Sequence, residues 1–160
     1  MSFHDAAPDD LAVVEASIGR PLAGRCAVVV RRLDGRPVVI ENEPHLRDGT
    51  PMPTLFWLVD PEIHEAVSRL EGAGGVHRFE DLVDPDALAQ THEAYAERRR
   101  RATVRTNGAQ PSGGVGGTRV GVKCLHAHLA NFLVGASDPV GELVAHEVDL
   151  PELVIEDVRA

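Results

Sequence analysis

A cysteine and two histidines occupy alternate positions in one short stretch of the chain. They are Cys124, His126 and His128, and the apolar periodicity around them predicts a helix from about 120 to 134. Side chains four residues apart share a helix face, so Cys124 and His128 would form a pair, whereas His126 would lie near the apolar face. Thiolate and imidazole groups are good ligands for Zn²⁺, and a four-coordinate site needs two more donors.

Two residues elsewhere in the chain could complete such a site. Cys26 stands at the start of the first predicted strand, and Asp60 follows the strand that carries Trp57. The same helical pair also permits thiol catalysis, in which His128 would lower the pKa of the Cys124 thiol near a helix N-terminus. A third interpretation gives the pair no chemistry: the cysteine is a small buried side chain, and the histidines bond to backbone carbonyls.

A glycine-rich segment leads directly into the predicted helix. Backbone N–H groups at a helix start, where glycine allows close approach, suit an anion or phosphate. The candidate anion ligands are Gly114, Gly116, Gly117, Arg119 and Lys123. The arginine run at 98–101 could add positive charge. Because the segment lacks the Gly-Lys-Ser/Thr of known phosphate loops, a mobile glycine-rich loop over 103–119 is the competing interpretation.

Composition restricts the classes of protein that fit. The chain has 160 residues, of which 43% are hydrophobic and 26% charged, as expected for a single globular domain over 1–160. Sixteen Lys and Arg against twenty-five Asp and Glu give a formal net charge of −9, which argues against general nucleic-acid binding. No apolar run approaches the ~20 residues that span a bilayer, and no signal peptide is evident. We therefore expect a cytoplasmic protein with reduced thiols.

The elements that would position these residues indicate an α+β fold. Two runs of β-branched residues, 26–30 and 37–40, flank Asp34-Gly35, which is a strong hairpin signal, and 54–59 is typical of a buried strand. We expect a small antiparallel or mixed sheet from the first half of the chain, packed by about four helices. Residues 147–160 form a late strand or a tail. Helices are predicted over 9–18, 60–71, 85–102, 120–134 and 138–146.

Five sequence blocks occur in a characteristic order. They are RC (25–26), GRPVVI (35–40), DGTPMPTLFWL (48–58), SRLE (68–71) and VKCLHAH (122–128). Together they resemble the uncharacterised bacterial family catalogued as domain of unknown function 501. Relatives commonly carry Cys-Pro where this chain has Asp60-Pro61, so the resemblance implies a site around Cys26, Asp60 and Cys124 with His126 or His128. Family genes often lie near an exopolyphosphatase and a division-septum protein, but the family has no assigned activity.

These observations predict an accessory cytoplasmic protein with a Cys/His site for a structural or regulatory metal ion such as Zn²⁺. We expect a binding role more than a catalytic one. One alternative is a small phosphate-, polyphosphate- or nucleotide-related enzyme or binding protein that uses the glycine-rich loop and the arginines. Another is a protein-interaction module whose partner acts in cell division or polyphosphate metabolism.

Overall fold

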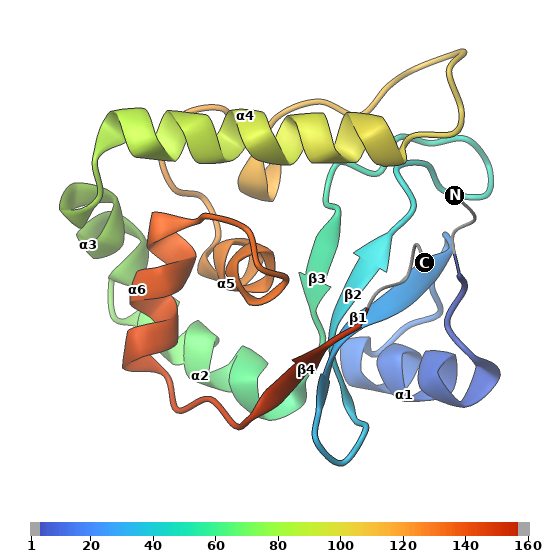
Figure 1. The fold of residues 1–160 in the computed structure, drawn as a ribbon, viewed down its shortest axis with the longest axis horizontal. Coiled ribbons are helices and arrows are strands. Elements are labelled where there is room, and N and C mark those ends of the chain that lie inside the picture. The colour runs from blue at the N-terminus through green and yellow to red at the C-terminus, as the bar shows by residue number, and fades with distance from the viewer. Residues whose placement is uncertain (1–3, 157–160) are drawn as a thin grey trace.

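The computed structural model describes residues 4–156 and is built around a four-stranded antiparallel sheet of order β3-β2-β1-β4 (Figure 1). The strands are β1 (Cys26–Arg32), β2 (Pro37–Asn42), β3 (Phe56–Leu58) and β4 (Leu153–Ile155). β1 and β2 form the predicted hairpin, and Gly35 in its turn adopts a φ of 94°, which glycine tolerates best. The α+β prediction is confirmed, and β4 shows that the C-terminal segment contains a late strand paired with β1.

Several helices begin where the sequence predicts. The helices are α1 (Pro8–Ile18), α2 (Pro61–Gly72), α3 (Gly75–Leu82), α4 (Pro85–Ala102), α5 (Leu125–Leu133), α6 (Pro139–Glu147) and the short 3₁₀ helix η1 (Val115–Gly117). Asp60, Asp84 and Asp138 precede α2, α4 and α6, and each carboxylate accepts a backbone N–H of the first turn. The sequence did not predict α3, which follows α2 directly because Gly74, with a φ of 84°, redirects the chain.

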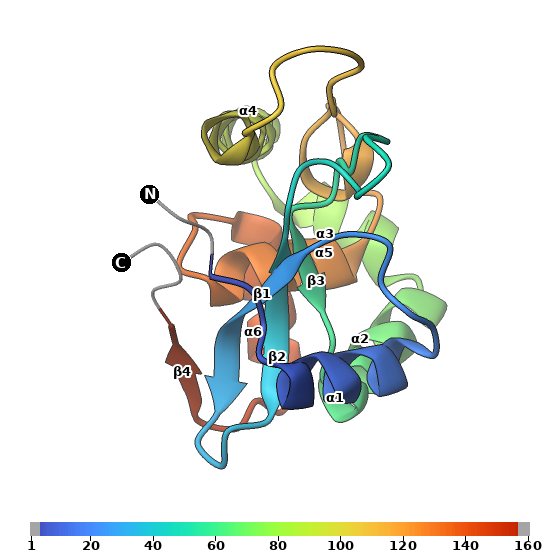
Figure 2. The same ribbon diagram turned by 90° about the vertical axis from the view of Figure 1, so that its right-hand side faces the viewer.

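The helices divide unequally between the two faces of the sheet. Figure 1 shows α1 on one side, α2, α3, α5 and α6 on the other, and α4 across the top. Figure 2 shows the same arrangement with α1 in front of the strands. The face under α1 buries a small cluster that includes Val14, Cys26 and Ile40. The opposite face holds the larger core, which fixes α5 against the edge strand β3.

The start of α5 differs from the prediction. The helix begins at Leu125, and Cys124 precedes it with an extended backbone at φ −146° and ψ 116°. The chain cannot be helical a few residues earlier, because Gly121 has a φ of 71° and the N–H of Val122 donates to a carboxylate oxygen of Glu80. The predicted helical pair of Cys124 with His128 was therefore wrong, because only His128 lies within the helix.

Polar side chains of α4 attach that helix to neighbouring loops. The Tyr95 hydroxyl accepts the N–H groups of Leu55 and Phe56 at the start of β3. Nδ1 of His92 accepts the N–H of Val115, a residue that is fully buried. The segment 103–119, predicted to be a mobile loop, contains no regular element longer than η1, but its later part is packed against α4 through Val115. Within residues 4–156, no helix has the length and apolar character needed to cross a bilayer.

Candidate metal centre

Three potential metal ligands converge where the end of α2 meets the start of α5. A carboxylate oxygen of Glu71, the Sγ of Cys124 and a ring nitrogen of His126 all lie within 4.8 Å of one another. Nδ1 of His126 is 2.5 Å from Oε1 of Glu71 and 3.9 Å from Sγ of Cys124. In the part of the chain that the structure describes, no other group of three such residues is close enough to share an ion.

The surroundings of His126 determine which of its ring nitrogens can bind an ion. Nε2 lies 3.1 Å from the carbonyl oxygen of His64 and 3.1 Å from Oγ of Ser68. The Ser68 hydroxyl donates its own hydrogen to the same carbonyl, so both neighbours accept from the Nε2–H. Neutral His126 therefore presents the Nδ1 lone pair to Glu71 and Cys124. Donation from the other ring nitrogen to a backbone carbonyl is the usual support of a metal-binding histidine.

Burial and charge shift the pKa values of the two neighbouring histidines in opposite directions. Burial opposes the charged form of His126, but hydrogen bonding to Cys124 and the negative charge of Glu71 outweigh it, so the pKa of His126 is raised. Burial, together with the adjacent His126, lowers the pKa of His64. The two rings lie 4.2 Å apart between centroids. A proton and a metal ion therefore compete for the position between Glu71 and His126.

A cavity of about 550 Å³ opens beside Cys124 and His126. Its walls come from the end of α1, from β3, and from the first turns of α2 and α5, and they include Arg20, Trp57 and His64. The guanidinium carbon of Arg20 lies 5.8 Å from the centre of the Trp57 ring. An aromatic wall with a few polar groups is typical of a small-molecule site. Two of the three candidate ligands thus border a space that could hold a further ligand.

Cys26 does not join this cluster. It is 4% exposed and belongs to the small core beneath α1. Burial, with a smaller contribution from the negative charges of Asp5 and Glu15, raises the pKa of the Cys26 thiol to about 11. A thiol with that pKa is protonated at neutral pH, whereas a metal ligand must be a thiolate. Both cysteines are free, and the group that could share an ion includes only Cys124.

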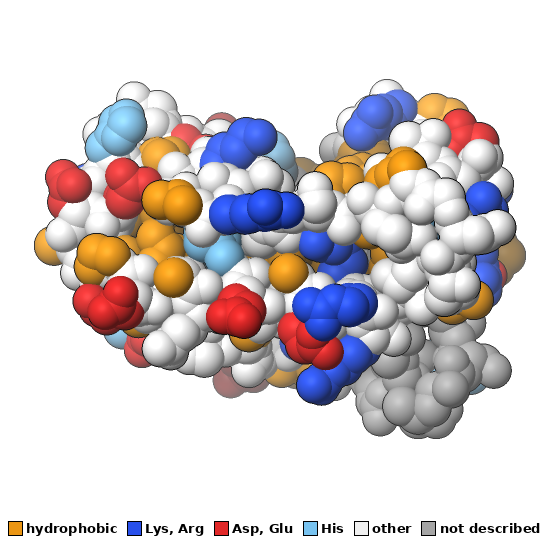
Figure 3. Space-filling view, turned by 90° about the horizontal axis from the view of Figure 1, so that it is seen from above, with side chains coloured by type: hydrophobic (Ala, Val, Ile, Leu, Met, Phe, Trp, Pro, Cys, Tyr) orange, Lys and Arg blue, Asp and Glu red, His pale blue; other side chains and the backbone are white. Residues whose placement is uncertain are grey.

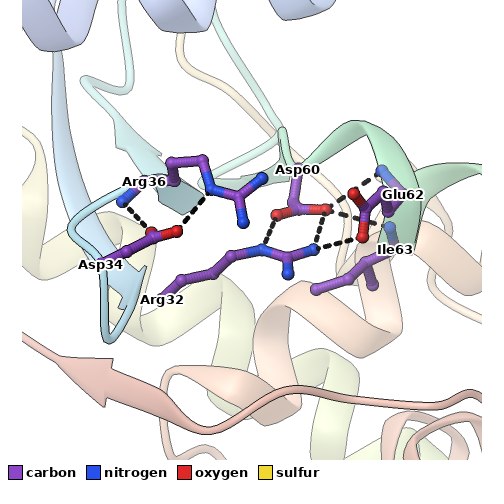
Figure 4. Close-up of polar contacts among 6 residues, drawn as sticks. All are labelled: Arg32, Asp34, Arg36, Asp60, Glu62 and Ile63. Carbon is purple, nitrogen blue, oxygen red and sulfur yellow. Dashed lines mark hydrogen bonds and ion pairs between the residues drawn. The ribbon is translucent and has the colours of Figure 1, made fainter.

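Asp60 is held by an ion pair (Figure 4). Its Oδ2 accepts from Nε of Arg32 at 2.5 Å, and its Oδ1 accepts from Nη2 of Arg32 at 2.9 Å. Oδ1 also accepts the backbone N–H groups of Glu62 and Ile63, each at 3.1 Å. Both carboxylate oxygens are therefore engaged in joining β1 to the start of α2, and Asp60 is absent from the metal-ligand cluster.

His128 belongs to a separate buried network between α5 and α6. It is 0% exposed, and its Nδ1 lies 2.9 Å from Oδ2 of Asp138. Asp138 also accepts from the side chain of Asn131 and from the backbone N–H of Gly141. The network caps α6 and joins it to α5, and the structure places His126, not His128, next to Cys124.

Replacing His128 by leucine is expected to destabilise the fold without removing a metal ligand. Asp138 would lose one of its buried hydrogen bonds, which typically costs about 1–3 kcal/mol. Urea unfolding measures this loss, and a zinc titration of the same variant is expected to give the wild-type stoichiometry. A folded His128→Leu protein that has lost zinc binding would instead place His128 in the site.

Two of the glycines in the glycine-rich loop use their backbone N–H groups within the loop itself. The N–H of Gly114 donates to the carbonyl of Thr118, and the N–H of Gly117 donates to the carbonyl of Gly114. Gly114 and Arg119 line a second cavity beside α4, whereas Gly116 lines the cavity at Cys124. Gly117 and Lys123 line neither cavity. The five predicted anion ligands therefore do not line one common cavity.

Sequence reasoning missed Glu71 and His64. Glu71 is one of several acidic residues on an amphipathic helix, and nothing in its spacing connects it to a cysteine far along the chain. His64 contributes a backbone carbonyl and a stacked ring, neither of which leaves a sequence pattern. The SRLE block was noted for its resemblance to a family, and that block contains Glu71.

Fold and site together define a small α+β protein that has, within residues 4–156, one Glu/Cys/His cluster beside a cavity. A family model matches residues 28–146, which are most of the chain and include all three candidate ligands. The chain belongs to this family, described as protein of unknown function (DUF501), and the resemblance seen in the sequence is confirmed. No curated protein and no solved structure matches the chain significantly.

Proposed function

We propose that this protein binds a divalent metal ion of the Zn²⁺ class through Glu71, Cys124 and His126. The observation that carries the proposal is the convergence of a carboxylate, a thiol and an imidazole within 4.8 Å. Sulfur and imidazole nitrogen together favour Zn²⁺ over Mg²⁺ or Ca²⁺, which prefer oxygen. The proposed role is that of a metal-binding accessory protein in the cytoplasm, where its two free cysteines stay reduced.

The arrangement favours a metal site over a catalytic triad. In a relay from thiol to histidine to carboxylate, the two partners of the histidine bond to different ring nitrogens. Here Glu71 and Cys124 both approach Nδ1 of His126, while Nε2 is occupied by His64 and Ser68. Ligand atoms that converge on one ring nitrogen of a histidine can share a metal ion. They cannot pass a proton from one ring nitrogen to the other.

Three protein ligands favour a regulatory or ligand-recruiting site over a closed structural one. Structural zinc sites normally have four protein ligands, whereas sites that exchange a ligand have three. The fourth position would face the cavity that Cys124 and His126 border. Two ligands of tetrahedral Zn²⁺ lie roughly 3.3 Å apart, so Glu71 would have to move back from His126. Its side chain is 25% exposed and has room to do so.

A zinc titration against a chromophoric chelator tests this proposal. We expect one ion per chain. We also expect unfolding to shift to higher temperature with zinc, because an ion that binds only the folded state stabilises it by about 2.7 kcal/mol at a free concentration 100 times the Kd. Addition of EDTA is expected to reverse the shift. A purified, folded protein that binds no zinc and shows no shift would contradict the proposal.

A further inference from the structure

Arg99 is a buried cation that has no acidic partner among the residues that the structure describes. The residue is 3% exposed and lies on α4. Its Nη1 donates to the carbonyl of Pro53 at 2.9 Å, and its Nη2 donates to the carbonyl of Gly113 at 2.8 Å. No carboxylate in residues 4–156 forms an ion pair with it. A buried charge is normally paired, and a guanidinium has five N–H donors, so the two carbonyls leave both charge and donors for a ligand.

Arg99 lines a cavity of about 660 Å³ between α4 and the glycine-rich loop. Arg100 and Arg119 line the same cavity, and Glu93 is the acidic residue in its wall. Figure 3, which looks down on this side of the molecule, shows Lys and Arg side chains gathered around a hollow. Although the whole chain has a net charge of −9, this cavity has an excess of positive charge.

Neighbouring groups cancel only part of this positive charge. His92 also lines the cavity, but both of its ring nitrogens are used: Nδ1 accepts from Val115, and Nε2 donates to the carbonyl of Gly121. Glu97 pairs with Arg100 and Arg101, and it is not a wall residue. Arg99 and Arg119 therefore remain as guanidinium groups with no acidic partner among the described residues.

We propose that this cavity binds a small phosphate or diphosphate compound, free or as an organic ester, whose phosphate group is held by Arg99 and Arg119. A guanidinium matches phosphate oxygens in geometry, and a phosphate ester carries about −1.5 to −2 charges at pH 7, more than a carboxylate offers. The alanines Ala89 and Ala96 of α4 give the wall an apolar part for the organic portion. The cavity size is in the range of small-molecule sites.

The glycines of the loop shape this site without cradling the phosphate. A Cβ on Gly114 would lie 2.5 Å from the His92 ring, so only glycine lets the loop approach α4 this closely. Because the N–H groups of Gly114 and Gly117 are already bonded within the loop, recognition comes from side-chain guanidinium groups. The proposed site is thus different from a phosphate loop, and it is independent of the metal cluster.

Isothermal titration calorimetry with ADP and with pyrophosphate tests the proposal. EDTA-treated protein in buffer that contains EDTA is used, so that a phosphate cannot bind through a metal ion. Arg119→Ala is the diagnostic variant, because Arg119 is exposed and its removal leaves the core intact. Arg101→Ala is the matched control: this exposed arginine lies on the same side of the molecule, at the end of α4, and does not line the cavity.

We expect the wild-type protein to bind at least one of the two probes, and Arg119→Ala to weaken that binding at least about tenfold, which corresponds to one lost charge-assisted hydrogen bond. Arg101→Ala is expected to stay within about twofold, since exposed charges outside the cavity are screened by salt. Failure of both probes to bind at millimolar concentration would overturn the proposal. Equal weakening by the two variants would also overturn it, because binding would then follow overall charge.

Discussion

Replacing Cys124 by alanine is expected to abolish stoichiometric zinc binding while the protein remains folded. The substitution removes the only sulfur of the Glu71, Cys124 and His126 cluster. Loss of an outer-shell partner already costs about 10–100-fold in metal affinity, and loss of a ligand costs more. Cys124 is half-buried and packs against the larger core, but its side chain makes no capping bond to α5, so we expect the small truncation to leave the protein folded. A chelator competition titration measures the change in affinity.

Cys26→Ala provides the matched control for this variant. It removes the other thiol of the chain, which is buried beneath α1 and has a pKa raised to about 11. We expect this control to retain one zinc ion per chain, with a moderate loss of stability from the vacated core volume. Zinc binding that survives in Cys124→Ala, or that disappears in a folded Cys26→Ala protein, would contradict the proposed ligand set.

Replacing Asp60 by alanine is expected to have the largest effect on stability. Asp60 is 2% exposed, pairs with Arg32 through both oxygens and caps α2 (Figure 4). Removing one member of a buried ion pair typically costs about 3–5 kcal/mol, and Arg32 would keep only its contact with the exposed carboxylate of Glu62. Since a domain of this size is stable by about 5–15 kcal/mol, the expected loss is a large part of the free energy of unfolding. Urea unfolding monitored by circular dichroism measures the loss.

Asp34→Ala is the control for the ion pair at Asp60. Asp34 pairs with Arg36 in the hairpin turn, and both side chains are more than half exposed. Exposed pairs contribute about 0–1 kcal/mol, so this variant is expected to unfold close to the wild type. If the two variants lose the same free energy of unfolding, the structural role assigned to Asp60 is wrong.

The contribution of Asp60 to the free energy of unfolding is also expected to depend on pH. Burial opposes its charged form, but the hydrogen bonds from Arg32 and from the backbone of α2 outweigh burial, so the pKa of Asp60 is lowered. A carboxyl group whose pKa is lower in the folded state stabilises the protein above its unfolded pKa of about 3.9. This contribution is lost as the pH falls through the folded pKa. The stability difference between wild type and Asp60→Ala is therefore expected to shrink in acid.

Local features of the sequence were sufficient to predict much of the fold. The turn at Asp34-Gly35 requires a positive φ that glycine provides, and the Asp-Pro pairs supply both a capping carboxylate and a preset first residue. These signals lie within a few residues of the structure they specify. The hairpin and the starts of α2, α4 and α6 could therefore be predicted from the sequence.

The candidate site was harder to predict because long-range contacts assemble it. The sequence identified Cys124 and His126 as possible ligands, but it paired Cys124 with His128 on the assumption of a continuous helix. Gly121 and the contact of Val122 with Glu80 shift the helix start, and this shift brings His126 beside Cys124. Glu71 comes from a different helix, and only the packing of α2 against α5 brings it to the site.

X-ray absorption at the zinc edge tests the central claim most directly, because it counts the sulfur ligands of the bound ion. We predict one sulfur at about 2.3 Å, with the remaining ligands nitrogen or oxygen at about 2.0–2.2 Å, and at least one of them imidazole. The sulfur contribution is expected to be unchanged in Cys26→Ala. Two sulfur ligands would bring Cys26 into the site, and a spectrum without sulfur would remove Cys124 from it. Either result would contradict a zinc site formed by Glu71, Cys124 and His126.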